Sequence, residues 1–141
     1  MASKTLYVGD KAVFDDGLDN TPAGQTTPAA GKFTNMDVTG ILKYSGTPQV
    51  LTGAGAVNIT TSITHLVTAG AGDALTLADG AEGQEKFIVT KTITTENDTS
   101  VLTPTTPSGF ATLTFDNVGD SAHLLFTNAA WHFMGGTATV A

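Results

Sequence analysis

The amino-acid sequence predicts an all-β protein, a small antiparallel β-sandwich or barrel preceded by an extended N-terminal arm. Threonine accounts for 26 of the 141 residues, while charged residues make up only 13%. Threonine is β-branched and suits a pleated surface, whereas strong helix formers such as Glu, Lys, Arg and Gln are scarce here. From about Val50 onward, short runs of alternating apolar residues are separated by clusters of turn residues. This pattern indicates consecutive short strands.

Residues 1–45 are expected to form the extended arm and a linker strand. Apolar residues are sparse there, and residues 15–31 are rich in Gly, Pro, Asp and Thr. Such a composition buries too little apolar surface to fold alone. The segment is therefore either a flexible leader or an arm that orders on another subunit or protein. The apolar residues proposed to dock the arm are Leu6, Tyr7, Val8, Val13 and Phe14.

Residues 46–141 are expected to form the sandwich or barrel. The predicted strands are residues 57–67, 74–78, 85–93, 100–103, 110–115, 121–126 and 130–135. Their spacing of roughly 8–12 residues is typical of sandwiches and barrels. The segment shows neither an amphipathic helix pattern nor a clean internal repeat, so a long repeat solenoid is not expected.

The last two runs predict a hairpin with a two-residue turn at Asn128 and Ala129. The expected cross-strand pairs are Phe126–Trp131, Leu125–His132, Leu124–Phe133 and His123–Met134. Because side chains alternate across a strand, one face of this hairpin forms the core. The predicted core residues are Leu124, Phe126, Trp131 and Phe133.

The opposite face of the hairpin is half apolar and carries no full charge at neutral pH. This is unusual for a solvated surface, so either a loop of the same chain or another subunit is expected to cover it. We favour a subunit, because a small domain has few spare loops. The predicted contact residues are His123, Leu125, His132 and Met134.

Charge and composition exclude several classes of function. With six Lys, no Arg and a formal net charge of −7, the chain lacks the basic stripe that binds nucleic acid or an anionic membrane. The absence of Cys excludes disulfides, zinc ribbons and iron–sulfur clusters. The sequence shows neither a membrane-spanning apolar run nor a signal peptide, so a soluble protein made in a cytoplasm is expected.

Enzyme activity and cofactor binding are not expected. No G-x-S-x-G motif occurs, and the glycine-rich residues 53–56 and 70–73 lack the Lys-Ser/Thr of a phosphate-binding loop. Nothing in the sequence pairs two carboxylates for acid–base work. The ionisable candidates considered are His65, His123, His132, Asp73, Asp79, Asp116 and Asp120.

Metal and glycan binding were weighed against simpler interpretations. His123 and His132 fall on one face of adjacent predicted strands, and three chains around an axis could hold an ion there. Interface imidazoles explain them more simply, because a metal-bound histidine normally sits with further ligands, so no metal is expected. A glycan-binding module remains an alternative, with Tyr7 and Tyr44 as the exposed aromatic candidates.

Two parts of the sequence resemble structural proteins of tailed bacteriophages. Residues 26–40, TTPAAGKFTNMDVTG, resemble a motif of phage fibre and virion proteins that introduces a trimeric β-module. Residues 75–91 and 110–136 resemble a domain of phage and marine-virus structural proteins, with a Gly-Asp-Ser before a strand and a terminal Trp-His. The resemblance implies an all-β, usually trimeric module without catalytic residues.

The size of the chain favours a capsid decoration (cement) or head-fibre protein within that class. We expect a homotrimer on the capsid surface of the virion, bound to the major capsid protein through its arm. Strand addition by such an arm uses main-chain hydrogen bonds and needs little sequence information. The alternative is a short tail-fibre, tail-tip or head-fibre component that binds a host glycan.

Overall fold

The structure is a computed structural model and describes residues 5–8, 11–14 and 37–141. The chain forms two units, Met1–Ile41 and Leu42–Ala141. Its strands are β1 (Thr5–Val8), β2 (Lys11–Phe14), β3 (Gln49–Thr52), β4 (Gly55–Val57), β5 (Ile63–Thr68), β6 (Ala71–Leu77), β7 (Gln84–Ile93), β8 (Thr99–Pro104), β9 (Pro107–Ser108), β10 (Leu113–Phe115), β11 (Ser121–Thr127), β12 (Ala130–Gly136) and β13 (Thr139–Val140). Over the described ranges, the chain contains no helix capable of crossing a lipid bilayer.

The first unit contains an antiparallel hairpin of β1 and β2, in which Leu6 lies opposite Val13. The predicted arm-docking residues Leu6, Tyr7 and Val8 belong to β1, and Val13 and Phe14 belong to β2. Their side chains, and residues 1–4, 9–10 and 15–36, lie outside the described part of the chain. Docking of the arm therefore stays a prediction.

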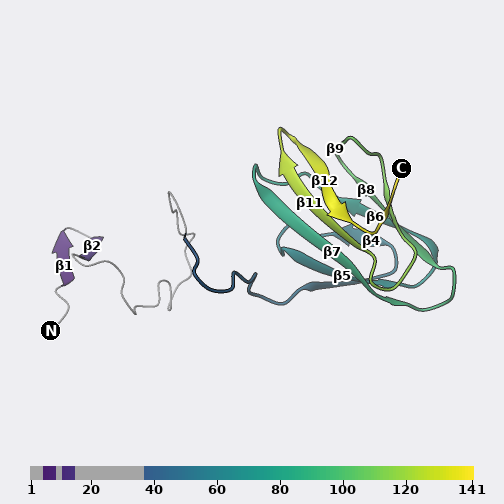
Figure 1. The fold of residues 1–141 in the computed structure, drawn as a ribbon, viewed down its shortest axis with the longest axis horizontal. Coiled ribbons are helices and arrows are strands. Elements are labelled where there is room, and N and C mark those ends of the chain that lie inside the picture. The colour runs from purple at the N-terminus through teal and green to yellow at the C-terminus, as the bar shows by residue number, and fades with distance from the viewer. Residues whose placement is uncertain (1–4, 9–10, 15–36) are drawn as a thin grey trace. The chain divides into compact units, whose positions relative to one another are not determined.

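The second unit is a β-solenoid of about three turns, because successive strands alternate between two sheets (Figure 1). β3, β5 and β7 pair in parallel in one sheet. β4, β6 and β8 pair in parallel in the other. Each pair of consecutive strands, β3–β4, β5–β6 and β7–β8, forms one turn. The predicted all-β class is correct, but the antiparallel sandwich or barrel is wrong.

Antiparallel strands complete both sheets after the third turn. β11 and β12 extend the first sheet, which has six strands in the order β3-β5-β7-β11-β12-β9. β10 and β13 extend the second sheet, which has five strands in the order β13-β10-β8-β6-β4. The last third of the chain thus extends the solenoid mainly by antiparallel pairing, with β9 paired in parallel with β12.

The turns of the solenoid differ in length, which explains why the sequence shows no repeat. Gln49 of β3 pairs with Thr64 of β5, 15 positions further along the chain. Ile63 of β5 pairs with Phe87 of β7, 24 positions further along. Because the loops between strands are unequal, apolar residues stack in space without recurring at a fixed interval. The expectation that no solenoid forms was wrong for this reason.

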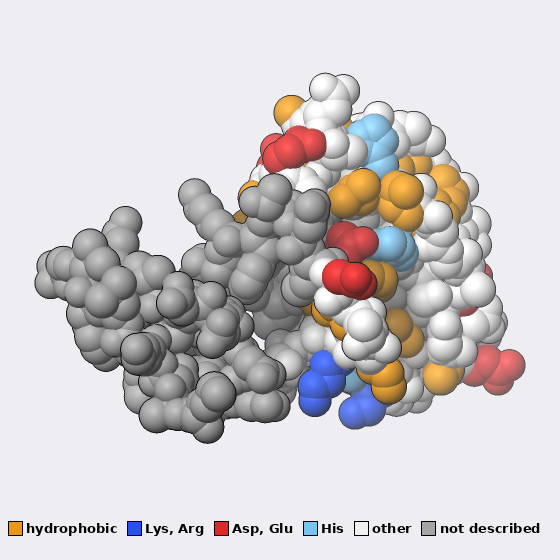
Figure 2. Space-filling model, turned by 60° about the vertical axis from the view of Figure 1, so that its left-hand side comes forward, with side chains coloured by type: hydrophobic (Ala, Val, Ile, Leu, Met, Phe, Trp, Pro, Cys, Tyr) orange, Lys and Arg blue, Asp and Glu red, His pale blue; other side chains and the backbone are white. Residues whose placement is uncertain are grey.

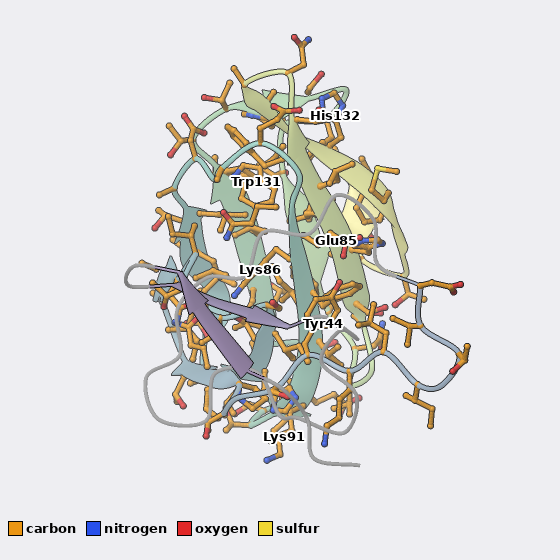
Figure 3. All side chains as sticks on the ribbon, turned by 90° about the vertical axis from the view of Figure 1, so that its left-hand side faces the viewer. Tyr44, Glu85, Lys86, Lys91, Trp131 and His132 are labelled. Carbon is orange, nitrogen blue, oxygen red and sulfur yellow. The ribbon has the colours of Figure 1, made fainter. Side chains whose placement is uncertain are left out.

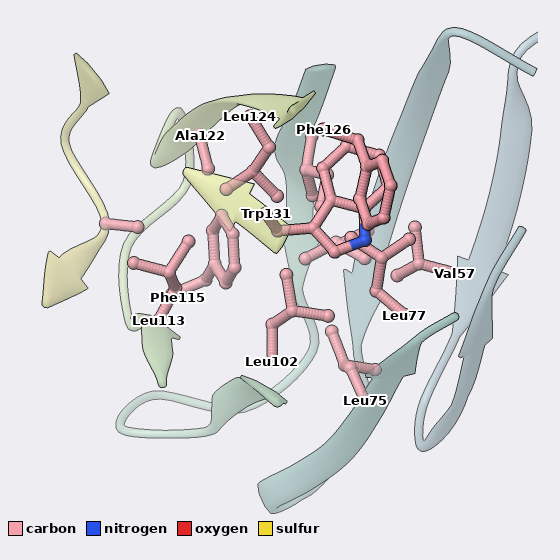
Figure 4. Packing of buried hydrophobic residues seen from close by; sticks show 13 residues of the cluster. Val57, Leu75, Leu77, Leu102, Leu113, Phe115, Ala122, Leu124, Phe126 and Trp131 are labelled. Carbon is pink, nitrogen blue, oxygen red and sulfur yellow. The ribbon is translucent and has the colours of Figure 1, made fainter. Parts of the chain in front are cut away.

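The two sheets enclose one apolar core (Figure 4). Trp131 is fully buried within it, and its indole Nε1 donates a hydrogen bond to the carbonyl of Ala78 at 2.9 Å. Its ring packs edge-on against Phe126, with ring centroids 5.2 Å apart. The prediction that Leu124, Phe126 and Trp131 face the core is confirmed. Phe133 is half-buried and packs against the same core, as predicted.

The predicted hairpin of β11 and β12 is confirmed, with one correction. Asn128 and Ala129 form its turn with φ of 51° and 57°, as a two-residue hairpin loop with left-handed residues requires. The pairs Phe126–Trp131, Leu125–His132 and Leu124–Phe133 form as predicted. The predicted pair His123–Met134 is wrong. The register shifts at a β-bulge between His123 and Leu124, so His123 lies opposite Gly135.

Candidate functional site: an apolar outer face

The candidate site is the outward side of the six-stranded sheet, over β3, β5, β7, β11 and β12. Along β5, β7 and β11 the inward residues are buried and most of the outward residues are only half-exposed. The residues of this outer face are Val50, Ile63, His65, Val67, Glu85, Phe87, Val89, Ser121, His123, Leu125, His132 and Met134. Figure 2 shows apolar and histidine side chains gathered on this side of the molecule. All three histidines of the chain belong to the outer face.

Strand pairing arranges these residues in rows across the sheet. His65, Val89 and Ser121 form one row. Phe87 lies between Ile63 and His123 in the next row, and Leu125 lies between Glu85 and His132 in the third. The predicted subunit-contact residues of β11 and β12 therefore continue into apolar residues of β5 and β7.

Tyr44 lies against this face and contacts two of its residues, Glu85 and Phe87. The Tyr44 hydroxyl donates a hydrogen bond to the Glu85 carboxylate, and its ring centroid is 5.5 Å from that of Phe87. The His123 ring stacks on Phe87 with centroids 4.4 Å apart, and its Nε2 is 3.2 Å from Glu85 Oε1. Figure 3 shows Tyr44 and Glu85 on the same side of the sheet. We call these four residues the Tyr44 cluster.

The hydrogen bond within the Tyr44 cluster keeps Glu85 ionised. Accepting the Tyr44 hydroxyl lowers the pKa of Glu85, and His123 lowers it further, against the opposing effect of burial. The same hydrogen bond, with burial and the nearby negative charge, raises the pKa of Tyr44. Among the outer-face residues, Glu85 alone carries a full charge at neutral pH. Lys91, a residue of opposite charge, lies further along the same strand, outside the outer face as defined above (Figure 3). The face is therefore nearly neutral, although the chain carries −7.

A hollow of about 240 Å³ lies in the outer face between β7, β11 and the end of β12. Its lining residues are Phe87, Ile88, Val89, Ser121, Ala122, His123, Gly135 and Gly136. Gly136 cannot be replaced without moving the backbone, because a Cβ there would lie 2.1 Å from the carbonyl oxygen of Ser121. Met134, just before these glycines in β12, is 56% exposed. The outer face thus carries a recess and a projecting apolar side chain in the same strand region.

A second, more polar pocket of about 200 Å³ lies between Tyr44 and the loop before β5. It is lined by Tyr44, Ser45, Gly46, Thr47, Pro48, Thr60, Thr61, Ser62 and Ile63. Hydroxyl groups predominate among these side chains, so the pocket offers hydrogen-bond donors and acceptors without a full charge. Tyr44, one of the two predicted glycan platforms, is at this pocket, whereas the side chain of Tyr7 lies outside the described residues.

Lys86 is buried inside the solenoid, next to the same loop. Its side chain is fully buried, and its Nζ donates hydrogen bonds to the carbonyl of Thr61 at 2.6 Å and to the Thr61 hydroxyl at 3.3 Å. Burial lowers the pKa of Lys86 to about 8. The amine ties β7 to the loop that begins the second turn, and so its role is to hold the fold.

Two of the carboxylates considered as catalytic candidates, Asp73 and Asp120, support local turns, whereas Asp79 accepts a hydrogen bond from the Thr106 hydroxyl at 3.0 Å. Asp73 accepts hydrogen bonds from the amides of Ala69 and Gly70. Asp120 accepts them from Asp116 and Asn117, which outweigh the effect of burial and lower its pKa. Within residues 37–141, no three His, Cys, Asp or Glu side chains come together as a metal site would require.

The structure places the predicted contact residues as follows. His123, Leu125 and His132 are half-buried on the outer face, and Met134 is exposed beside them. The sequence analysis missed Tyr44, Glu85, Phe87 and Val89 as part of the same surface. The signal for the last three was the alternation within residues 84–93, which puts them on one side of a strand.

No family model matches the chain, and no curated protein matches it.

Proposed function

We propose that this protein is a non-enzymatic structural protein of a bacteriophage particle, a homotrimeric capsid decoration protein that stabilises the head. The observation that carries the proposal is the nearly neutral, largely apolar outer face on a chain with a net charge of −7. Contiguous apolar surface of this kind marks a contact with another protein.

Charge distribution supports association through this face. Residues 42–141 contain eight Asp and Glu against three Lys, so copies repel one another over most of their surface. The outer face lacks this excess and is the surface on which repulsion is weakest. A trimer formed there carries three times the charge of the chain, which keeps it away from nucleic acid.

Attachment to the capsid is assigned to the N-terminal unit. The β1–β2 hairpin has two unpaired edges in the described strands, and an edge strand can extend a sheet of a capsid subunit through main-chain hydrogen bonds. A trimer bound across joints between capsid subunits adds binding free energy there. That energy opposes the internal pressure of packaged DNA.

A second candidate function is a short tail-fibre, tail-tip or head-fibre component that binds a host glycan. The hydroxyl-lined pocket at Tyr44 favours it, because an aromatic ring beside several hydroxyls suits a saccharide. Glycan-array binding that disappears in Tyr44→Ala would support this candidate over decoration alone.

The test of the proposal is the copy number of this chain in purified virus particles, relative to the major capsid protein. A decoration protein is expected at a ratio comparable to the capsid protein. A ratio far below that value would support the fibre candidate instead. Absence from the particle would refute both virion functions.

A further inference from the structure

We propose that Met134 of one copy inserts into the hollow of the next copy, and that three such contacts close the trimer. The inference rests on the proposed function, from which it takes the threefold symmetry. It adds the two surfaces that meet: the Met134 side chain and the recess between β7, β11 and β12.

Shape is the first argument. The hollow holds about 240 Å³ and is walled by Phe87, Val89 and His123, with Gly135 and Gly136 at its β12 side. Met134 projects from the same face and is 56% exposed, although it is a large apolar residue. Methionine is flexible and fills irregular apolar recesses well. Because the projection and the recess are separate parts of this face, the projection of one copy can enter the recess of another.

Rigidity is the second argument. The Phe87 and His123 rings that wall the hollow are stacked, and Glu85 contacts His123 and Tyr44 from the side. Walls fixed before binding lose little conformational entropy when the contact forms. A pocket of this kind at the centre of an interface is where single apolar anchors contribute most.

Charge identifies the occupant as apolar and neutral. The one carboxylate near the hollow, Glu85, already accepts the Tyr44 hydroxyl and lies against His123, so it has little capacity left for a basic partner. None of the residues that line the hollow is Asp, Glu, Lys or Arg. The exposed Met134 of a second copy satisfies these requirements.

The rotation that relates one copy to the next determines how many copies form a closed ring. With the threefold rotation taken from the proposed function, the contact is head-to-tail and closes as a ring, whereas a rotation that does not close would give an open filament. Three copies each then donate one Met134 and receive one, which leaves no copy unpaired.

Cysteine cross-linking tests the contact directly, because the chain contains no cysteine of its own. Met134→Cys and Val89→Cys are combined in the full chain, which is oxidised mildly and run on a non-reducing denaturing gel. Within one chain these positions are separated by β11, about 10 Å from strand to strand, beyond the Cα separation that a disulfide spans. The expected product is a covalent trimer, and each single variant stays monomeric.

The matched control pairs Met134→Cys with Val118→Cys, since Val118 is equally apolar and 64% exposed but does not line the hollow. This control is expected to give no covalent trimer. Monomer or covalent dimer as the end product of the Met134–Val89 pair overturns the inference. If light scattering shows a trimer that does not cross-link, the contact is elsewhere and the proposed function stands.

Filling the hollow gives an independent test. Ser121 lines it from β11, and Ser121→Leu is expected to weaken trimer formation at least tenfold by sedimentation, while Ser121→Ala leaves it unchanged. Circular dichroism verifies that both variants fold. Equal trimer stability in a folded Ser121→Leu protein contradicts the inference, and the Cys pair decides the matter if that variant does not fold.

Discussion

At the residue scale, Lys86 is the most unusual side chain of the solenoid. Its side chain is fully buried and its amine is bonded to Thr61, and none of its hydrogen-bond partners in the described part of the chain is a carboxylate. Burying a charge without an opposite charge is costly, and the lowered pKa of about 8 expresses that cost. The side chain nevertheless supplies a donor to a loop carbonyl that lies half-buried between two turns.

Titration of Lys86 is expected to make the free energy of unfolding depend on pH in the alkaline range. The folded-state pKa of about 8 lies below the ordinary value of 10.5, so the unfolded chain binds more protons between these values. The free energy of unfolding therefore rises with pH from about 8, by up to about 1.4 kcal/mol per pH unit. Urea unfolding at pH 7.5, 8.5 and 9.5, at one protein concentration, measures this rise.

The variant Lys86→Met is expected to remove that rise, because methionine fills the same space without a titrating group. Lys91→Met, at an exposed position on the same strand, is the control and should keep it. A flat profile in the unmodified protein would show that Lys86 does not titrate between pH 8 and 10.

At the scale of elements, the turn between β11 and β12 offers a direct test of backbone strain. Ala129 has φ of 57°, a left-handed conformation that costs an L-residue about 1 kcal/mol. Ala129→Gly is expected to stabilise the protein by roughly 0.5 kcal/mol, since glycine relieves the strain but loses more chain entropy. The change appears as a higher Tm in thermal unfolding.

The neighbouring Ala130 provides the matched control. It begins β12 opposite Thr127, where glycine gains nothing and weakens the strand. Ala130→Gly should lower Tm. If both glycine variants lower Tm, the turn is not strained as its φ values indicate.

The strands themselves were largely predictable, but their pairing was not. Alternation located β7 and β11 to within a residue or two, because burial of every second side chain leaves a direct mark on the sequence. The turn at Asn128 also fixed the register of Leu125 with His132. Alternation does not say whether the neighbouring strand runs parallel, so the coil of β3–β8 was missed.

The residues of the outer face were likewise predictable in part. The half of it on β11 and β12 followed from a local hairpin, in which residues close in sequence become neighbours. Glu85 and Phe87 join Leu125 and His123 from about 38 positions away, through pairing of β7 with β11. The extra residue that places His123 opposite Gly135 leaves no trace in the apolar pattern, since a bulge depends on backbone geometry.

Leu125 lies at the centre of this face and tests its role in assembly. Leu125→Asp adds a second carboxylate directly opposite Glu85, in a surface that is otherwise nearly neutral. We expect monomer or aggregate by light scattering, because a contact that buries this position leaves the new charge unpaired. Thr76→Asp, on the exposed side of β6, is the control and should remain a trimer. A well-behaved trimer of Leu125→Asp would refute the predicted contact.

At the scale of the whole molecule, the two units of the chain differ in whether they contain an apolar core. Residues 42–141 contain one continuous core enclosed by two sheets, so this unit has the means to fold and associate on its own. In the N-terminal unit, the described residues form one hairpin of two four-residue strands. An isolated two-stranded hairpin is marginally stable at best. We therefore expect the N-terminal unit to act on a partner and not within the free protein.

Deleting residues 1–20 separates these two contributions. The deletion removes β1 and β2 with the predicted docking residues Leu6, Tyr7, Val8, Val13 and Phe14, and leaves the solenoid and its outer face intact. The truncated protein is expected to remain a folded oligomer by light scattering and circular dichroism, yet to lose attachment to capsids in a sedimentation assay. Full occupancy of shells by the truncated protein would mean that the capsid contact lies on the solenoid, and a monomer would mean that the arm, not the outer face, joins the copies.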